Sequence, residues 1–356
     1  MARRTALIRS PRARVAGVLG ATVALVAATT LVAAPAQAAP PAACGMTITS
    51  SYTLRSDLTC EGTAITVVLS PGQRITLDLG GRTLDGDGTG VGVFVSAEEG
   101  CGTVVVRNGR ISGFDAGVSG TGVADLSLRD LTVTDVGAWL DHGLEVLALG
   151  VDGSAFVDAG NGGGYVESTT TVRKSRFLRS GVASPSESYT YVYDSTFIEG
   201  GVSTGDAANL VAERNMFRDC DVAIDVRDSW PSSPTIVRHN RVLGCRVGME
   251  LQVVLAGTGP TAVSVIGNEF RGNTEEGLRF AVWTDIGETV ITGNRVTGNG
   301  GTGIHGTSSG LITLTRTTAT GNGGHGIDVS GALDGGGNKA GGNALQPQCI
   351  GIACSR

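Results

Sequence analysis

Five ionisable residues recur along the second half of the sequence at intervals of 23 to 29 residues, each directly after an apolar residue. They are Asp225, Glu250, Arg279, His305 and Asp328. Side chains of a strand alternate between two faces, so an apolar residue that points inward places its successor in solvent. If the intervals correspond to successive strands of one sheet, neighbouring members lie about 5 Å apart. We call these five residues the charged column.

The charged column could catalyse a reaction on a sugar. Asp225 and Glu250 could share a proton, because two close carboxylates oppose joint ionisation, or they could bind Ca²⁺. Arg279 could hold a sugar carboxylate or act as the base of a β-elimination, and His305 could transfer protons near neutral pH. The alternative is a solvated sheet face on which opposite charges pair between repeats. No metal ligands are assigned, and no cofactor other than Ca²⁺ is considered.

Two tryptophans follow the same predicted strands and are candidates for substrate binding. Trp230 and Trp283 come five or six residues after the inward apolar positions, and Asp228 and Asp285 lie beside them. An exposed Trp offers a flat apolar face to a sugar ring. The alternative is that each Trp packs its own loop against the rest of the protein.

A repeat positions these residues. The segments 263–273 and 289–299 share a template with apolar residues at positions 3 and 8, Val or Thr at position 1 and Asn at positions 6 and 11. Ten steps separate the first position 8, Leu84, from the last, Ala319, so the mean step is about 23.5 residues. Position 8 is occupied by Leu84, Ile111, Val133, Phe156, Phe177, Phe197, Phe217, Val242, Phe270, Val296 and Ala319.

The repeat predicts an all-β fold, a right-handed parallel β-helix of about 11 turns. Each repeat holds two or three short segments with alternating apolar residues, joined by Gly, Asn and Asp turns. The 56 Gly and 4% aromatic residues disfavour helical repeats. Stacked turns predict a Phe ladder (Phe156, Phe177, Phe197, Phe217) and an Asn ladder (Asn215, Asn240, Asn268, Asn294) inside the fold. Both ladders are interpreted as scaffold and not as chemistry.

The Gly-Asn repeats Asn268–Asn273 and Asn294–Asn299, with the opening Cys44-Gly45 and the closing Gly335-Gly336-Gly337-Asn338, resemble secreted actinobacterial parallel β-helix proteins. This pectin-lyase-like group, to which residues 44–356 are similar, includes polysaccharide lyases, hydrolases, epimerases and non-catalytic proteins. The segment from Trp139 to His142 resembles a pectate-lyase motif, but it fits a long turn better.

The resemblance also suggests how the ends are closed. An open end of a β-helix exposes unpaired strand edges, so we expect caps. Residues 39–72 form a linker and cap joined by Cys44 and Cys60, residues 73–332 form the β-helix, and residues 333–356 form a second cap joined by Cys349 and Cys354. Cys220 and Cys245 share position 11 of adjacent repeats, where they form either a disulfide or two stacked buried thiols.

Residues 1–38 read as a signal peptide, with five Arg, an apolar stretch and an Ala-Gln-Ala cleavage site. We therefore expect a secreted protein with disulfides and no membrane span. The whole chain has a formal net charge of −6, and removing the five Arg makes it −11. Such a charge disfavours nucleic acid as a partner.

Three functions remain open. The first is a polysaccharide lyase, hydrolase or epimerase that uses the charged column. The second is a non-catalytic module that binds polysaccharide or cell-wall glycan. The third is a structural or interaction protein, which the featureless repeats between residues 172 and 210 favour. In each case we expect a monomer.

Overall fold

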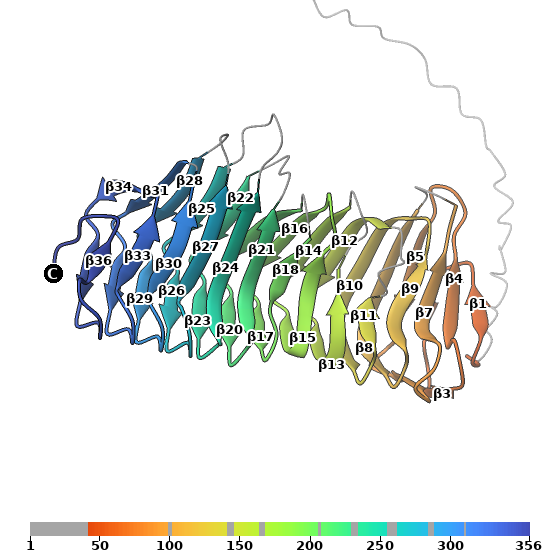
Figure 1. Ribbon diagram of the computed structural model, residues 1–356. Helices are drawn as coiled ribbons and strands as arrows, with labels where there is room; N and C mark the ends of the chain where they lie inside the picture. Colours follow the sequence, from red (N-terminus) through yellow and green to blue (C-terminus); the bar gives the residue numbers. More distant parts are fainter. Residues whose placement is uncertain are drawn as a thin grey trace, which may run out of the picture. The chain divides into compact units, whose positions relative to one another are not determined.

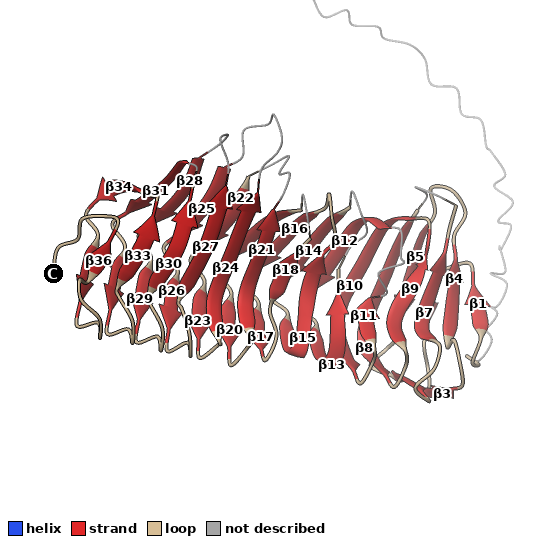
Figure 2. Ribbon diagram, viewed as in Figure 1, coloured by secondary structure: helices blue, strands red, loops and turns tan. Residues whose placement is uncertain are grey.

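The computed structural model describes residues 42–98, 102–140, 146–163, 168–205, 208–228, 234–254, 262–283, 288–309 and 311–356. Within these ranges all helix or strand structure is strand, with no helix (Figure 2). The strands run parallel to their neighbours in adjacent turns and stack turn upon turn (Figure 1). The predicted parallel β-helix is confirmed, with about 12 turns instead of 11.

Each turn contributes strands to three faces of the coil. The first, here the column face, carries the charged column. It contains β1 (Met46–Ile48), β4 (Ile65–Val68), β7 (Val91–Ser96), β9 (Ala116–Thr121), β11 (Ala138–Leu140), β18 (Val202–Thr204), β21 (Val222–Asp228), β24 (Val247–Val254), β27 (Leu278–Trp283), β30 (Ile304–Ser308), β33 (Ile327–Ser330) and β36 (Cys349–Ile350).

The second face, here the tyrosine face, follows in each turn. It contains β2 (Tyr52–Thr53), β5 (Arg74–Asp78), β12 (Val146–Asp152), β14 (Thr169–Arg173), β16 (Tyr189–Tyr193), β19 (Asn209–Glu213), β22 (Thr235–Arg238), β25 (Ala262–Ile266), β28 (Glu288–Thr292), β31 (Leu311–Thr315) and β34 (Leu333–Gly336).

The third face, here the ladder face, holds position 8 of the repeat. It contains β3 (Leu58–Cys60), β6 (Thr83–Gly86), β17 (Thr196–Ile198), β20 (Met216–Arg218), β23 (Arg241–Leu243), β26 (Glu269–Arg271), β29 (Arg295–Thr297), β32 (Thr318–Thr320) and β35 (Lys339–Gly341). Longer strands bend from one face to the next: β8 (Thr103–Ser112), β10 (Val123–Thr134), β13 (Ala155–Gly162) and β15 (Arg176–Ser184).

Stacked side chains fill the interior as the repeat predicts. The rings of Phe156, Phe177, Phe197 and Phe217 stack in order, with centroids 4.8, 4.7 and 4.8 Å apart. Trp139 extends this ladder: it is fully buried, its ring lies 4.7 Å from Phe156, and its indole N–H donates to the Gly181 carbonyl. Trp139 is therefore a core residue, and Asp141 and His142 lie outside the described residues.

The Asn ladder is also present. Asn240 Nδ2 donates to Asn268 Oδ1 at 3.0 Å and to the Ala212 carbonyl at 2.8 Å, and Asn268 repeats this pattern one turn on. A second ladder joins position 11 from Asn273 to Asn343, with 2.9 Å between successive amides. Each buried amide thus satisfies polar groups of two neighbouring turns, which explains its scaffold role.

Three disulfides lie in the described part of the chain. Cys44 pairs with Cys60, and Cys349 pairs with Cys354. Cys220 and Cys245 are bridged, with 4.3 Å between their Cα atoms, so the alternative of two stacked thiols is wrong. Disulfides persist in oxidising compartments, which indicates an extracytoplasmic protein.

The segments expected to cap the ends also contain strands of the coil. β3 pairs with β6 at one end, and β35 pairs with β32 at the other. The expected signal peptide, residues 1–38, and Cys101 lie outside the described residues. In the described ranges, no helix is long and apolar enough to cross a membrane.

Candidate functional site

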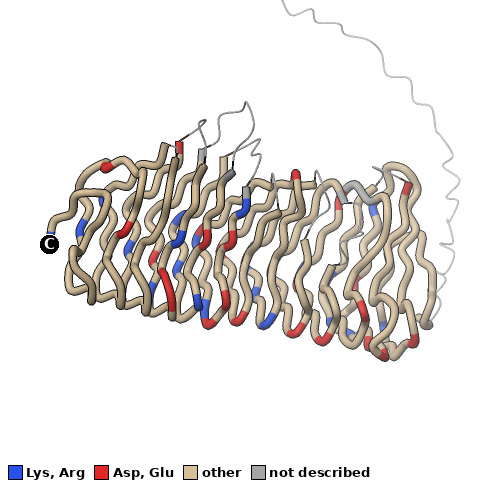
Figure 3. Tube along the Cα trace, in the orientation of Figure 1, with Lys and Arg blue, Asp and Glu red and all other residues tan. Residues whose placement is uncertain are grey.

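The five residues of the charged column lie side by side on the column face. Asp225 pairs in register with Glu250, Glu250 with Arg279, Arg279 with His305, and His305 with Asp328. Each preceding apolar residue is fully buried, from Ile224 to Ile327, so the column points to solvent. Figure 3 shows charges of both signs along this face. The repeat alone predicted this register.

Most of the column is engaged in ion pairs. Arg227 holds Asp225 at 3.1 Å, and His305 Nδ1 lies 3.6 Å from Asp328 Oδ2. Arg279 does not pair with its register neighbour Glu250; its guanidinium donates to Glu275 at 3.0 Å and to Glu276 at 2.6 Å. In the later part of the column, His305 and Asp328 therefore lie together between repeats, as the alternative expects, whereas Arg279 pairs within its own repeat.

Arg279 is poorly suited to act as a base. Partial burial works to lower its pKa, but the hydrogen bond to Glu276 and the charges of Glu276 and Glu250 outweigh this effect and raise the pKa above its usual value. Its proton is therefore held more firmly than in a free guanidinium. Among its expected roles, binding an anionic group suits Arg279 better than proton abstraction.

Glu250 is surrounded differently from the rest of the column. Its carboxylate accepts a hydrogen bond from Gln252 at 3.4 Å, and it has no ion pair with an Arg or Lys of the described chain. Its register partner Asp225 is held by Arg227. Two adjacent carboxylates with different neighbours can take different roles in proton transfer.

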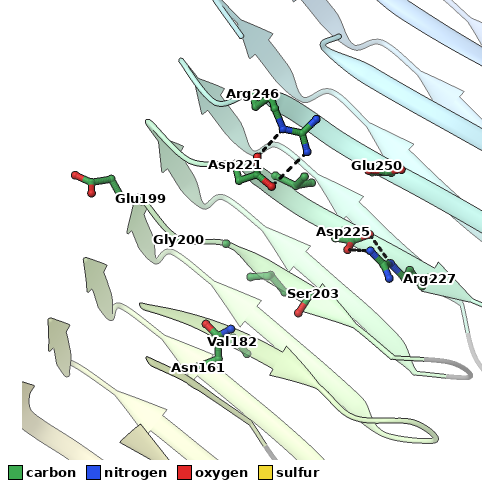
Figure 4. Close-up of a pocket in the computed structure, with 13 residues that line it drawn as sticks. Asn161, Val182, Glu199, Gly200, Ser203, Asp221, Asp225, Arg227, Arg246 and Glu250 are labelled. Carbon is green, nitrogen blue, oxygen red and sulfur yellow. Dashed lines mark hydrogen bonds and ion pairs between the residues drawn. The ribbon is translucent and has the colours of Figure 1, made fainter. Parts of the chain in front are cut away.

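An open hollow of about 350 Å³ lies above this carboxylate pair (Figure 4). Its floor is formed by β15, β18, β21 and β24, so it extends from the charged column toward earlier turns. Its charged and polar lining comprises Asn161, Glu199, Ser203, Asp221, Asp225, Arg227, Arg246 and Glu250. Arg279, His305 and Asp328 do not line it. The structure thus separates the five candidate catalytic residues into a pair inside the hollow and three outside it.

Asp221 and Arg246 form the rim of the hollow on its ladder-face side. Arg246 contacts Asp221 through two nitrogens, at 2.5 and 3.3 Å, and donates to Glu275 at 2.9 Å. The hydrogen bond from Arg246 lowers the pKa of Asp221. Because Glu275 also accepts from Arg279, an ion-pair chain connects this rim to the middle of the charged column.

Sequence reasoning missed this rim, although a signal was present. Asp221 and Arg246 directly follow Cys220 and Cys245, which share one position of the repeat. The disulfide between those cysteines joins the two turns beside the ion pair. Because Cys220 and Cys245 share one position of the repeat, the residues that follow them also lie side by side. The opposite charges of Asp221 and Arg246 could therefore have predicted an ion pair from the sequence.

The expected substrate-binding residues are described only in part. Trp283 ends β27 and is 48% exposed. Asp228 ends β21 in register with Val253. Trp230 and Asp285 lie outside the described residues. Of the two tryptophans, Trp283 lies in the described residues, and its ring is exposed as the substrate-binding prediction requires.

Calcium was expected only as a ligand of paired carboxylates. Within the described ranges, no group of three or more His, Cys, Asp or Glu lies close enough together to hold a metal ion. The pair of Asp225 and Glu250 offers two carboxylates, fewer than the six to eight oxygen ligands that Ca²⁺ takes. A bound Ca²⁺ would need water or substrate oxygens to complete its shell.

No family model matches the chain, and no curated protein matches it. Solved structures do. A single-residue variant of the periplasmic alginate epimerase AlgG is 14% identical, with 76% of this chain and 78% of that chain covered and a TM-score of 0.50. The unsubstituted AlgG is 15% identical over the same shares, with a TM-score of 0.49.

A GH87 α-1,3-glucanase catalytic domain, solved with tetrasaccharides, is 9% identical, with 88% of this chain and 63% of that chain covered and a TM-score of 0.27. Of these structures, only the AlgG variant with a TM-score of 0.50 bears on the fold, and at 14% identity it bears on nothing more. The first AlgG structure supports the parallel β-helix independently of the repeat.

Proposed function

We propose that this protein acts on a polysaccharide, cleaving a glycosidic bond in the hollow above Asp225 and Glu250. The observation that carries the proposal is the pair itself: two carboxylates in register on adjacent strands, in an open polar hollow, with Arg227 beside only one of them. Most glycoside hydrolases use two carboxylates that flank the scissile bond as their catalytic residues. The fold is shared with an alginate epimerase, whose name records a polysaccharide substrate.

The neighbours of the pair suggest a division of roles. We assign the anionic role to Asp225 and the proton-donor role to Glu250, because Arg227 forms an ion pair with Asp225 and no Arg or Lys of the described residues forms one with Glu250. Glu250 would then donate a proton to the leaving oxygen. Asp225 would stabilise the positive charge that develops on the sugar ring or activate water against it. Arg246, at the rim, could orient an acidic group on the substrate.

The test measures turnover and binding separately. Purified protein would be incubated with a panel of polyuronates and neutral glucans, and new reducing ends counted. Asp225→Asn and Glu250→Gln should each lower turnover by roughly a hundredfold or more, with the melting temperature unchanged. The matched control is Glu269→Gln, a carboxylate of the ladder face that pairs with Arg241. Equal turnover in all three variants would refute the assignment.

A second candidate is a non-catalytic glycan-binding module. It is favoured by the ion pairs that occupy Arg279, His305 and Asp328, and by the exposed ring of Trp283 beside them. Affinity electrophoresis in gels containing each glycan distinguishes the two. Retarded migration without turnover, abolished by Trp283→Ala, supports the module. If no glycan on the panel is either bound or cleaved, both candidates fail.

A further inference from the structure

The tyrosine face carries a stripe of aromatic rings far from the carboxylate pair. Three of the five Tyr in the chain, Tyr189, Tyr191 and Tyr193, lie on β16. The residues between them, Thr190 and Val192, are buried, so all three tyrosines are on the outward side of the strand. The rings of Tyr191 and Tyr193 are nearly parallel, 14° apart in orientation and 6.4 Å between centroids. In a chain with 4% aromatic residues, this is a concentrated apolar surface.

A hollow of about 280 Å³ adjoins this stripe. It is lined by Asp152, Arg173, Lys174, Tyr193, Asp194 and Arg214, from β12, β14, β16 and the corners that follow them. The guanidinium carbon of Arg173 lies 5.3 Å from the centroid of the Tyr193 ring. Burial raises the pKa of Tyr193, so its hydroxyl is protonated and the ring uncharged at neutral pH. The hollow therefore combines one neutral aromatic wall with several charges.

The cations of this hollow are only partly neutralised. Arg214 is held by Asp194 at 2.8 Å and by Glu213. Arg173 and Lys174 form no ion pair with any carboxylate of the described residues, although the register partner of Arg173 is Asp152. Arg173 and Lys174 are adjacent in the chain, and both line the hollow. Their positive charges can attract an anion to this hollow, although the net charge of the protein is negative.

The backbone points to the same residues. Lys174, Asp194 and Arg214 occupy one corner in three successive turns, and each has a positive φ, of 48°, 50° and 57°. Of the other turns, three place Gly153, Gly267 and Gly293 at this corner, and two place His239 and Arg316 there, also with a positive φ. A side chain in the left-handed region costs free energy that glycine avoids. Where three charged residues replace glycine in succession, a function that needs their side chains is a physical reason for the substitution.

We propose that this hollow binds an acidic saccharide, with a sugar ring against Tyr193 and the acidic group between Arg173 and Lys174. Tyrosine offers the sugar a flat apolar surface with a polar tip, and guanidinium binds carboxylate or sulfate through paired hydrogen bonds. The site is separate from the carboxylate pair, because β14 and β16 belong to a different face from β21 and β24. A free phosphate fits less well, because it offers no apolar ring to the tyrosine.

Binding would be measured by isothermal titration with four probes: a galacturonate oligomer, a sulfated dextran, neutral dextran and polyphosphate. We expect binding of at least one of the two acidic saccharides, and which of them binds identifies the acidic group. Arg173→Gln and Lys174→Gln should each weaken that binding about tenfold, the loss expected for one charge-assisted hydrogen bond. Tyr193→Ser should weaken it similarly, whereas Tyr193→Phe, which keeps the ring, should bind nearly as the original protein does.

Two controls keep this test independent of the proposed catalytic function. Arg176→Gln removes an exposed charge from the ladder-face end of β15 and should leave binding unchanged. Glu250→Gln should abolish turnover but not binding at the tyrosine face. The proposal is overturned if neither acidic saccharide binds, if neutral dextran binds as well as they do, or if polyphosphate binds equally and Tyr193→Ser has no effect. A circular-dichroism melt of each variant shows that the fold persists.

Discussion

Two regions of the coil share one strand register but differ in the residues at their corners. We call residues 146–254, from β12 to β24, the middle turns, and residues 262–330, from β25 to β33, the late turns. In the late turns Gly occupies the corners at Gly267, Gly272, Gly293, Gly298 and Gly321, and Arg316 is the exception among described residues with positive φ. In the middle turns most of these corners carry charged residues, among them Lys174, Asp194 and Arg214, and glycine remains at Gly153, Gly160 and Gly244.

This difference separates scaffold from function. The late turns follow the local preferences of the backbone, whereas ion pairs occur in both regions, as between Arg279 and Glu276 in the late turns and between Arg214 and Asp194 in the middle turns. The middle turns depart from those preferences, and both hollows discussed above lie over them. Departures from local rules are expected at functional sites. The repeats that conform best to the template are therefore the weaker place to look for chemistry.

The largest expected difference between the regions lies in their cores. Phe197 is fully buried and stacks on Phe177 and Phe217, so Phe197→Ala should lower the free energy of unfolding by about 4 kcal/mol. Val296 occupies the same register position in a late turn, and Val296→Ala should cost about 2 kcal/mol. Urea denaturation followed by circular dichroism measures both. Equal losses would show that ring stacking adds nothing special to the middle turns.

For substitutions in the buried polar ladder we expect the opposite order, with a larger loss of stability in the late turns than in the middle turns. Asn268→Ala removes the side-chain acceptor of the Asn240 backbone N–H and of one Asn240 amide hydrogen, and the side-chain donor to the Val237 carbonyl, and should cost about 3 kcal/mol. In the middle turns the same column holds Ser175, whose hydroxyl donates to the Arg173 carbonyl and accepts from the Ser154 N–H. Ser175→Ala should cost about 1 kcal/mol because fewer groups are orphaned. The same urea titrations apply, and a Ser175 variant as unstable as the Asn268 variant would contradict the comparison.

The fold could be predicted from the sequence because the repeat constrains every turn at once. One inward position per turn, such as Phe197 or Val296, fixes the register, and the register then places Asp225 beside Glu250. The corners are a harder matter. In the sequence Lys174 and Arg214 resemble ordinary surface charges. Lys and Arg rarely adopt a positive φ, so their residue types predict neither this backbone conformation nor the hollow that they share.

The site could be predicted only in part for a related reason. Columns on one face follow from the repeat, but a hollow depends on side chains from corners and strands together, as with Asp221 and Asp225. Ion pairs such as Arg279 with Glu276 depend on rotamers and on the turn before the strand. The repeats between residues 172 and 210 looked featureless because their tyrosines and corner charges are not part of the template.

Exchanging corner residues between the regions should have a smaller effect, with opposite signs. Lys174→Gly relieves a residue held at a φ of 48° and should raise the free energy of unfolding by about 1 kcal/mol. Gly293→Lys should lower it by about 1 kcal/mol through backbone strain alone, because no atom lies within 4 Å of the added Cβ. Thermal melting resolves both. If Lys174→Gly destabilises the protein, the positive φ at this corner does not strain Lys174, and the contrast between the corners fails.

The smallest expected difference is in response to acid. Hydrogen bonds from Arg179, Arg214 and Arg246 lower the pKa values of Asp158, Asp194 and Asp221, all of them in the middle turns. A carboxyl whose pKa is lowered by folding stabilises the protein above its unfolded pKa, about 3.9, and that contribution is lost as the pH falls through the lower folded value. The middle turns should therefore loosen first in acid.

The size of this effect is limited because the three pairs lie at the surface, where water and salt screen them. We expect the melting temperature of the original protein to fall between about pH 5 and about pH 2, and to fall less steeply in 1 M salt than in dilute buffer. A triple variant, Asp158→Asn, Asp194→Asn and Asp221→Asn, should start from a lower melting temperature and lose less of it in acid. Glu269→Gln provides a control, since it removes a late-turn carboxylate that pairs with Arg241. If that single variant flattens the acid response as much as the triple variant does, acid sensitivity is spread along the coil, and the contrast between middle and late turns is confined to their corners and cores.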